Sequence, residues 1–253
     1  MSQIAIMQPT YLPWIGYFDL IDQSNTFVFL DTVQFERQSW QQRNRVKIQN
    51  GLHWLSVPVL RSGHSTQSIR EMEIAKSPAF PLKHLRTIEQ HYRRAPYFDD
   101  YFPAFEELLS RDEDLLSNLN QALIQWIAKE VGIQADFKCS SDLRANGKRS
   151  ELLVNICLEL GSASYLSPLG SAGYILEEQE NFALAGIAVA FQHYEHPNYR
   201  QLSEPFLPYA SILDLLFNEG DKALDILRSG RRPHYSLDEA RHRAASRTPE
   251  TSL

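Results

Sequence analysis

The chain has 253 residues, of which 43% are hydrophobic and 22% are charged. This size and composition predict a soluble globular protein with one large domain, or with one domain that carries a helical insertion. The net charge of −6 argues against a general attraction to nucleic acid or anionic lipid, although a local basic patch can still bind phosphate.

The cysteine content and the N-terminus indicate where the protein resides. Cys139 and Cys157 make neither a disulfide framework nor a metal site, and they fit a reducing cytoplasm. The N-terminus has no basic region ahead of its apolar residues, and Pro9 and Pro13 interrupt those residues, so we expect no signal peptide. No window approaches the roughly 18 uncharged apolar residues of a membrane helix. We therefore expect a cytoplasmic protein without membrane insertion.

The chain opens with a strand, a loop, a helix and a second strand. Residues 4–7 are apolar and predict a buried strand that ends at Gln8. Residues 14–21 have the apolar spacing of a short helix, and residues 26–30 predict another buried strand. This order is the start of a βαβ unit, in which the two strands are parallel and the crossover is right-handed.

A hairpin and a helical region follow. Two strand-like segments, at 45–48 and 54–59, flank an Asn-Gly pair, which is the signature of a type I′ turn. We expect a polar loop at 60–68 and another strand at 69–75. The next stretch predicts three helices, the last of which is closed by a glycine C-cap, and they occupy residues 82–92, 98–109 and 114–131. We interpret about residues 80–132 as a helical insertion that caps one edge of the sheet.

The α/β alternation returns in the second half of the chain. Strands are predicted at 137–140, 163–166 and 187–192, and helices at 148–160, 175–182, 211–217 and 221–227. The pattern as a whole predicts an α/β fold with a mixed, mostly parallel sheet and flanking helices. We expect one α/β domain over residues 1–230. Residues 231–253 are polar and charged, and they predict a partly disordered C-terminal tail.

The turn after the first strand is the first candidate site. Ligands of open α/β sheets lie outside the carboxyl ends of the strands, and a helix N-terminus suits phosphate or carboxylate. Gln8 can donate and accept hydrogen bonds there, and Tyr11, Trp14 and Tyr17 offer flat faces to a base or a sugar. The alternative is a proline-stiffened corner whose aromatic residues fill the core. The residues alone leave both interpretations open.

A basic strand is the second candidate. Arg43, Arg45 and Lys47 alternate, so on a strand they share one face and can form an anion site. Asn44, between them, could contact a sugar hydroxyl or an amide. The alternative, a solvated strand edge blunted by positive charge, is favoured slightly by composition alone.

Two further segments follow predicted strands. In YLSPLGSAGY, the small residues Ser167 and Gly170 let the backbone approach a ligand next to Tyr174, although the segment is neither a Walker A loop nor a GxGxxG motif. In HYEHPNYRQ, His193 is the candidate general base, and Tyr199 and Gln201 are further polar candidates. The two histidines of this segment lack a third ligand, so we predict no metal site, and no particular cofactor is indicated.

Together these segments resemble the WbqC-like protein family. The resemblance rests on MQPTYLPWIGYFDLI, on RNRVK followed by WLSVPV, on ELGSASYLSPLGSAGY, and on HPNYRQ followed by SILDLLFNEG, and it covers most of residues 3–220. Members of the family are similar to proteins encoded with O-antigen and other surface-polysaccharide genes. The resemblance implies modification of a nucleotide-activated amino sugar by aminoacyl or acyl transfer. More distantly, the opening resembles nucleotidyltransferase-like and Rossmann-like folds, although the HxGH histidines have no counterpart between Tyr11 and Tyr17.

Three hypotheses about function follow from these observations. The leading one is a cytoplasmic transferase that acts on a phosphorylated or nucleotide-linked small molecule. The second is a non-catalytic sugar-nucleotide-binding or scaffold protein of the same pathway. The third is an ATP-dependent, nucleotidyltransferase-like enzyme that activates a carboxylate. The first requires the proline-aromatic bend and the Arg-Asn-Arg strand to meet at one cleft.

Overall fold

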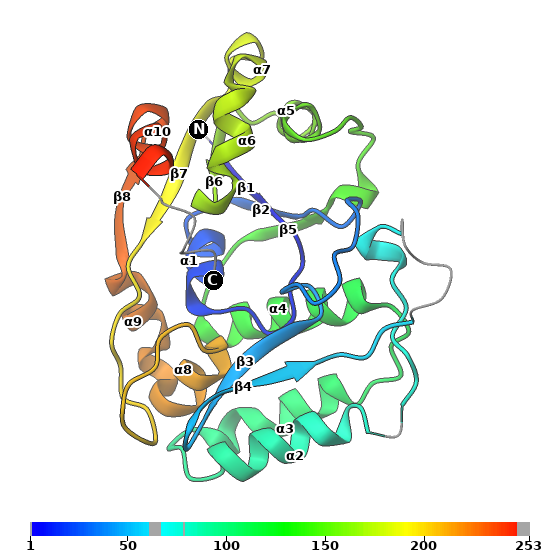
Figure 1. The fold of residues 1–253 in the computed structure, drawn as a ribbon, viewed down its shortest axis with the longest axis vertical. Coiled ribbons are helices and arrows are strands. Elements are labelled where there is room, and N and C mark those ends of the chain that lie inside the picture. Colours follow the sequence, from blue (N-terminus) through cyan, green and yellow to red (C-terminus); the bar gives the residue numbers. More distant parts are fainter. Residues whose placement is uncertain (1, 61–66, 78, 247–253) are drawn as a thin grey trace.

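Six strands of the computed structural model form one sheet (Figure 1), and the structure describes residues 2–60, 67–77 and 79–246. In chain order the strands of this sheet are β1 (Gln3–Met7), β2 (Thr26–Phe29), β5 (Asp136–Cys139), β6 (Ser164–Ser167), β7 (Ala188–Tyr194) and β8 (Arg231–Tyr235). Their order across the sheet is β5-β2-β1-β6-β7-β8. All neighbours are parallel except β7 and β8, which are antiparallel. The mixed, mostly parallel α/β fold predicted from the sequence is confirmed.

The strand order locates the place where ligands bind to such sheets. Numbered along the chain, the six strands lie in the order 3-2-1-4-5-6, which is that of the Rossmann fold. The chain proceeds outward from β1 through β2 to β5, and then returns to the other side of β1 with β6. The crevice between the carboxyl ends of β1 and β6 is therefore the topological switch point.

Alternate strand residues pack against different groups of helices, because successive side chains point to opposite faces of a sheet. Ala5, Phe27 and Leu166 belong to one hydrophobic cluster, and Ile4, Val28 and Tyr165 to another. The first cluster contains residues of α1 (Ile15–Asp22), α4 (Leu116–Val131), α8 (Ile212–Glu219) and α9 (Ala223–Ser229). The second contains residues of α5 (Ser150–Glu159), α6 (Ala172–Glu177), α7 (Gln179–Leu184) and α10 (Leu237–Ser246), which lie in the upper half of Figure 1.

The segment between β2 and β5 supplies a hairpin and three helices. β3 (Arg43–Ile48) and β4 (Gly51–Ser56) form a separate two-stranded sheet around the predicted Asn-Gly turn. They lie with α2 (Leu82–Tyr92) and α3 (Phe98–Leu109) at the bottom of Figure 1. Helix α4 ends at Gly132, whose φ of 89° is the left-handed conformation that favours glycine at a helix C-terminus. The three helices predicted for this region are present.

Two local predictions need correction. The residues expected to begin a polar, partly disordered tail form β8 and α10 over 231–246, while 247–253 lie outside the described residues. The polar composition of β8 did not indicate a strand because its residues make internal contacts. The Arg231 Nε donates to Asp19 at 2.9 Å, and Tyr235 packs in the second hydrophobic cluster. The strand expected at 69–75 is a short 3-10 helix, Ile69–Glu71, followed by isolated bridges.

No helix in the described ranges combines the length and the apolar character that crossing a membrane requires.

Candidate functional site

A cavity of about 890 Å³ lies at the carboxyl ends of β1 and β6, which is the switch point of the sheet. Its walls come from segments far apart in the chain, namely residues 6–17, 36–45, 168–174 and 192–195, together with Leu30, Leu153, Tyr209, Tyr235 and Arg243. The volume lies in the range of about 300–1,000 Å³ that is typical of small-molecule sites. Position and size therefore make this cavity the candidate site, and we call it the cleft.

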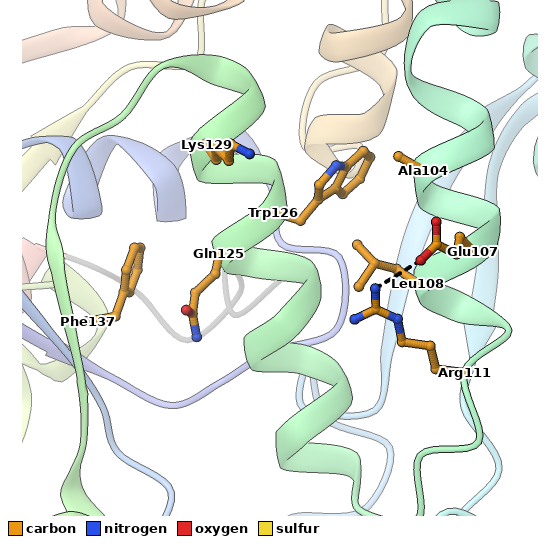
Figure 2. Close-up of a pocket in the computed structure, with 8 residues that line it drawn as sticks. All are labelled: Ala104, Glu107, Leu108, Arg111, Gln125, Trp126, Lys129 and Phe137. Carbon is orange, nitrogen blue, oxygen red and sulfur yellow. Dashed lines mark hydrogen bonds and ion pairs between the residues drawn. The ribbon is translucent and has the colours of Figure 1, made fainter.

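Figure 2 shows a second, shallower hollow between α3, α4 and the edge strand β5. It measures about 490 Å³, and Leu108, Trp126 and Phe137 contribute apolar surface to it. Its Arg111 and Glu107 side chains pair with each other at 3.1 Å. This hollow lies away from the switch point and brings together none of the predicted site residues.

Hydrogen bonds fix the turn that follows β1. The side chains of Gln8 and Gln41 are joined at 2.9 Å, and the Tyr17 hydroxyl donates to the Gln8 carbonyl at 3.0 Å. The Tyr11 amide donates to the Trp40 carbonyl at 3.0 Å. The turn is thereby attached to the segment before β3, so that both line one side of the cleft.

Trp14 forms an aromatic wall at the start of α1. Its ring stacks on His196 at 6.1 Å between centroids and meets the rings of Tyr194 and Tyr209 edge-on at 5.6 and 5.4 Å. The ring also lies directly against Gly16, where an added Cβ would be 2.2 Å from a ring carbon. In the sequence Pro-Trp-Ile-Gly, Pro13 therefore belongs to the turn, Trp14 forms the aromatic wall, and Gly16 leaves room for the Trp14 ring.

Strand β3 meets this turn, as the leading hypothesis requires. The Asn44 side chain donates to the Leu12 carbonyl at 2.8 Å, and the Ser211 amide donates to the Arg45 carbonyl at 2.7 Å. Arg45 consequently lies next to the start of α1 and lines the cleft. Because no side chain caps α1, its positive end and this guanidinium act on the same space.

The other two cations of the basic strand occupy different surroundings. The Arg43 guanidinium lies 4.4 Å from the centroid of the Trp54 ring and does not line the cleft. Lys47 is buried, and its Nζ donates to the Pro205 carbonyl. The expected grouping of three cations is therefore reduced to two: Arg43 and Arg45 both lie over the Trp54 ring, whereas Lys47 is buried against another segment.

His193 lies near the end of β7 with its ring held on two sides. The ring stacks on Tyr235 at 4.1 Å between centroids, and Nδ1 lies 3.3 Å from the Pro233 carbonyl. A carbonyl can only accept, so this contact favours the tautomer with hydrogen on Nδ1. Nε2, which is 3.7 Å from Glu195 Oε1, then keeps a lone pair that can accept a proton.

The turn after β6 contributes backbone and one aromatic ring. Ser167 is buried, and its hydroxyl donates to the Pro168 carbonyl at 3.2 Å. Nothing lies within 4 Å of the position that a Cβ would take at Gly170, so this part of the turn is open. Tyr174 lines the cleft, and burial raises the pKa of its hydroxyl.

The predicted site residues therefore divide into two groups. The structure brings together in the cleft Gln8, Trp14, Tyr17, Asn44, Arg45, Gly170, Tyr174 and His193. It keeps away from the cleft lining Tyr11, Arg43, Lys47, Ser167, Tyr199 and Gln201. Three of the latter serve buried contacts: Tyr11 with His84, and Tyr199 and Gln201 with Asp214.

With this geometry established, the chain was compared with known proteins. The model of the WbqC-like protein family matches residues 8–226, which is well over half of the chain. The chain belongs to the WbqC-like protein family. Similar in sequence is "Uncharacterized protein Rv1507c" from Mycobacterium tuberculosis (strain ATCC 25618 / H37Rv), which is 34% identical over 230 residues, or 90% of this chain and 98% of the relative. No solved structure gave a significant match.

The WbqC-like region does not contain the whole cleft, and sequence reasoning missed several lining residues. Glu36, Ser39, Trp40 and Gln41 precede the basic strand, and their position beside that motif was the available signal. Glu195, Tyr194 and Tyr209 lie in or near the His193 segment. Tyr235 and Arg243 lie C-terminal to the family match, in the segment that was predicted to be a tail. No sequence signal indicated that they would line the cleft.

A buried histidine supports the turn of this WbqC-like protein and predicts a pH dependence. His84 Nδ1 lies 2.8 Å from the Tyr11 hydroxyl, the ring also hydrogen-bonds the Ser56 backbone, and burial lowers the pKa of His84 from 6.5 to about 4. As the pH falls, His84 therefore becomes protonated at a higher pH in the unfolded chain than in the folded protein. The free energy of unfolding that neutral His84 contributes is fully present above pH 6.5 and is lost as the pH falls toward 4.

We expect His84 to account for about 3 kcal/mol of the stability lost between pH 7 and pH 4. In His84→Asn, the amide oxygen replaces Nδ1 as the acceptor for Tyr11 but does not titrate. Urea unfolding at several pH values measures both proteins. The wild type should lose more stability than the variant over this range, and parallel curves would contradict the assignment.

Proposed function

We propose that this protein is a transferase that modifies a nucleotide-activated amino sugar, by aminoacyl or acyl transfer, in surface-polysaccharide biosynthesis. The supporting observation is the cleft at the switch point, where the positive end of α1, the Arg45 guanidinium and the aromatic wall of Trp14 adjoin. The choice of substrate class and pathway draws on the family resemblance described above.

The chemistry of the cleft lining suits such a substrate. Arg45 and the first turn of α1 offer positive charge to a diphosphate, because guanidinium groups and helix N-termini both bind phosphate oxygens. Trp14 and Tyr174 line the cleft with aromatic rings, which a base or a sugar can contact. Gln8 adds a side-chain amide nitrogen for a sugar hydroxyl, whereas the Asn44 side chain already bonds to the Leu12 carbonyl and the Arg45 amide. A nucleotide-linked sugar would use all three kinds of contact at once.

His193 is the proposed general base of the transfer. With hydrogen on Nδ1, its Nε2 accepts a proton from the amino group of the sugar. The amine nitrogen forms a bond to the carbonyl carbon of an activated acyl donor, and the bond from that carbon to the leaving group breaks. Glu195, at 3.7 Å from Nε2, then lies close to the imidazolium that results.

The first test of this proposal is ligand binding, measured by the shift in melting temperature. We expect UDP-, dTDP- or GDP-linked sugars to stabilise the protein in proportion to the logarithm of ligand concentration over Kd. Arg45→Gln should weaken that binding by about tenfold, the loss expected for one charge-assisted contact at a solvated site. Arg144→Gln, an exposed position outside the cleft, is the matched control and should bind like the wild type.

Three results would count against the proposal. If no sugar nucleotide stabilises the protein, the cleft does not bind this class of ligand. If ATP alone does so, and pyrophosphate release then requires Mg²⁺ and an amino acid, the protein activates a carboxylate instead. In a third case, retained binding and absent turnover with every acyl donor would favour the non-catalytic sugar-nucleotide-binding alternative.

A further inference from the structure

Two tryptophans and two arginines form a cluster on the β3–β4 hairpin and the segment before it. We call this cluster, made of Trp40, Arg43, Arg45 and Trp54, the Trp–Arg rim. The two indole rings are 5.2 Å apart at an angle of 38°, and Trp40 and Trp54 remain 38% and 40% exposed. Trp40 and Arg45 also line the cleft, so the rim begins at the cleft and extends outward over the hairpin.

Among the residues that the structure describes, the arginines of the rim have no charged partners. The Arg43 guanidinium lies 4.4 Å from the Trp54 centroid, and that of Arg45 lies 5.4 Å from the centroids of both Trp40 and Trp54. Within the described part of the chain, neither forms an ion pair, and the Nε atom of each is buried without a hydrogen-bond partner. Burial also lowers the pKa of Arg45.

Cation–π packing alone does not explain why two arginines lie together without an acidic partner among the described residues. A cation–π contact at an exposed site contributes about 0.5–1 kcal/mol, whereas two like charges two residues apart on one strand repel each other. Unpaired, partly desolvated guanidinium groups are stabilised by an anion, and the planar fork of arginine matches the geometry of phosphate. The two indole rings beside them remain partly exposed and can contact a sugar ring.

We propose that the Trp–Arg rim is a second subsite that binds a sugar phosphate, with the phosphate on the guanidinium groups of Arg43 and Arg45 and the sugar ring on the indole of Trp54. This inference goes beyond the proposed function, because the acyl donor of that transfer is not a sugar phosphate. Since Trp40 and Arg45 also line the cleft, a sugar phosphate on the rim lies beside whatever ligand the cleft binds.

Other occupants fit these observations less well. Single-stranded nucleic acid also binds to arginine and aromatic residues, but it requires a longer positively charged groove, and the chain carries a net charge of −6. A neutral glycan would use the indole rings and leave both guanidinium groups without an anion. A sugar phosphate uses both halves of the rim.

The test follows the indole N–H signals by NMR during titration with glucose 1-phosphate. Trp54→Phe identifies the signal of Trp54, which lies outside the cleft lining and therefore reports on the rim alone. We expect this signal to move saturably, with glucose and inorganic phosphate each binding at least about tenfold more weakly than glucose 1-phosphate. Arg43→Gln should weaken the binding by about tenfold, and Arg144→Gln should not change it.

Several outcomes would overturn the inference. These are an unmoved Trp54 signal, equal binding of glucose and glucose 1-phosphate, equal binding of inorganic phosphate, and tighter binding of a single-stranded oligonucleotide. Unaltered affinity in Arg43→Gln would also overturn it. The circular dichroism spectrum of each variant confirms that it is folded before the titration is interpreted.

Failure of the rim and failure of the cleft give different results. Because Arg43 lies outside the cleft lining, Arg43→Gln should leave the melting-temperature shift with a sugar nucleotide unchanged. If the rim binds glucose 1-phosphate while no sugar nucleotide stabilises the protein, the subsite stands and the proposed function falls. If a sugar nucleotide stabilises the protein but glucose 1-phosphate does not bind at the rim, the subsite falls and the proposed function stands.

Discussion

Replacing Asp214 with alanine is expected to lower the free energy of unfolding by about 3–5 kcal/mol, because three hydrogen-bond donors lose their acceptor and each stranded buried donor costs about 1–3 kcal/mol. Asp214 lies in the first turn of α8 and is only 1% exposed. Its Oδ1 accepts from the Tyr92 hydroxyl at 2.9 Å, and its Oδ2 accepts from the Tyr199 hydroxyl and the Gln201 amide, each at 2.8 Å. Alanine would leave these three donors without their acceptor.

The network matters beyond α8 because it joins four segments. The Tyr92 hydroxyl, on α2, also accepts from the Lys47 amide of β3 at 2.8 Å. Burial raises the pKa of Asp214, while the hydrogen bonds from Tyr199, Gln201 and Tyr92 and the charge of Lys47 act against that rise. The carboxylate therefore ties β3, α2, α8 and the loop around Gln201 together behind the cleft.

Urea unfolding of three variants tests the role of this network. Asp214→Asn keeps the shape and one acceptor oxygen, so it should lose less stability than Asp214→Ala. Tyr92→Phe removes the hydrogen bond to the Asp214 carboxylate and leaves the Lys47 amide without its acceptor, so it should cost at least about 1.5–3 kcal/mol. An alanine variant within about 1 kcal/mol of the wild type, smaller than the usual penalty for stranded buried donors, would contradict this account.

The elements that the sequence predicted well are those that local patterns determine. The apolar runs of β1 and β2, the Asn-Gly hairpin and the periodic α4 all depend on neighbouring residues, and each is present. Strand order depends instead on pairing between distant segments, such as β1 with β6. Strand β8 was missed because a polar run normally indicates solvent exposure, whereas its Arg231 forms ion pairs with the buried Asp19 and with Asp22.

The candidate site was predictable to a similar degree. The rule that ligands lie at the carboxyl ends of strands indicated the turn after β1, whereas the meeting of that turn with the basic strand was a requirement of the leading hypothesis. Which polar residues face the cleft did not follow, because tyrosine and glutamine serve equally as ligand contacts and as buried hydrogen-bond donors. Tyr199 and Gln201 were read as site residues, yet they bond to Asp214, whose role no motif indicated.

Replacing Gly16 with alanine is expected to cost about 2–3 kcal/mol of stability, as overpacking in a close-packed region does, and to weaken ligand binding in the cleft. The added Cβ would lie 2.2, 2.3 and 2.6 Å from three carbons of the Trp14 ring, so the ring must move. It would then lose its contacts with Tyr194, His196 and Tyr209. Alanine otherwise favours a helix over glycine by about 1 kcal/mol, so a net loss of stability identifies the clash as the cause.

A double-mutant cycle isolates this clash. In a Trp14→Ala background the obstructing ring is absent, so Gly16→Ala should there be neutral or stabilising in urea unfolding. Gly173→Ala is the matched control, because it lies in α6 and nothing is within 4 Å of its added Cβ. An equal cost of Gly16→Ala in both backgrounds would mean that Trp14 is not what requires the glycine. If the cost disappears together with the indole, the Pro-Trp-Ile-Gly segment is constrained by the wall of the cleft, and not only by the turn between β1 and α1.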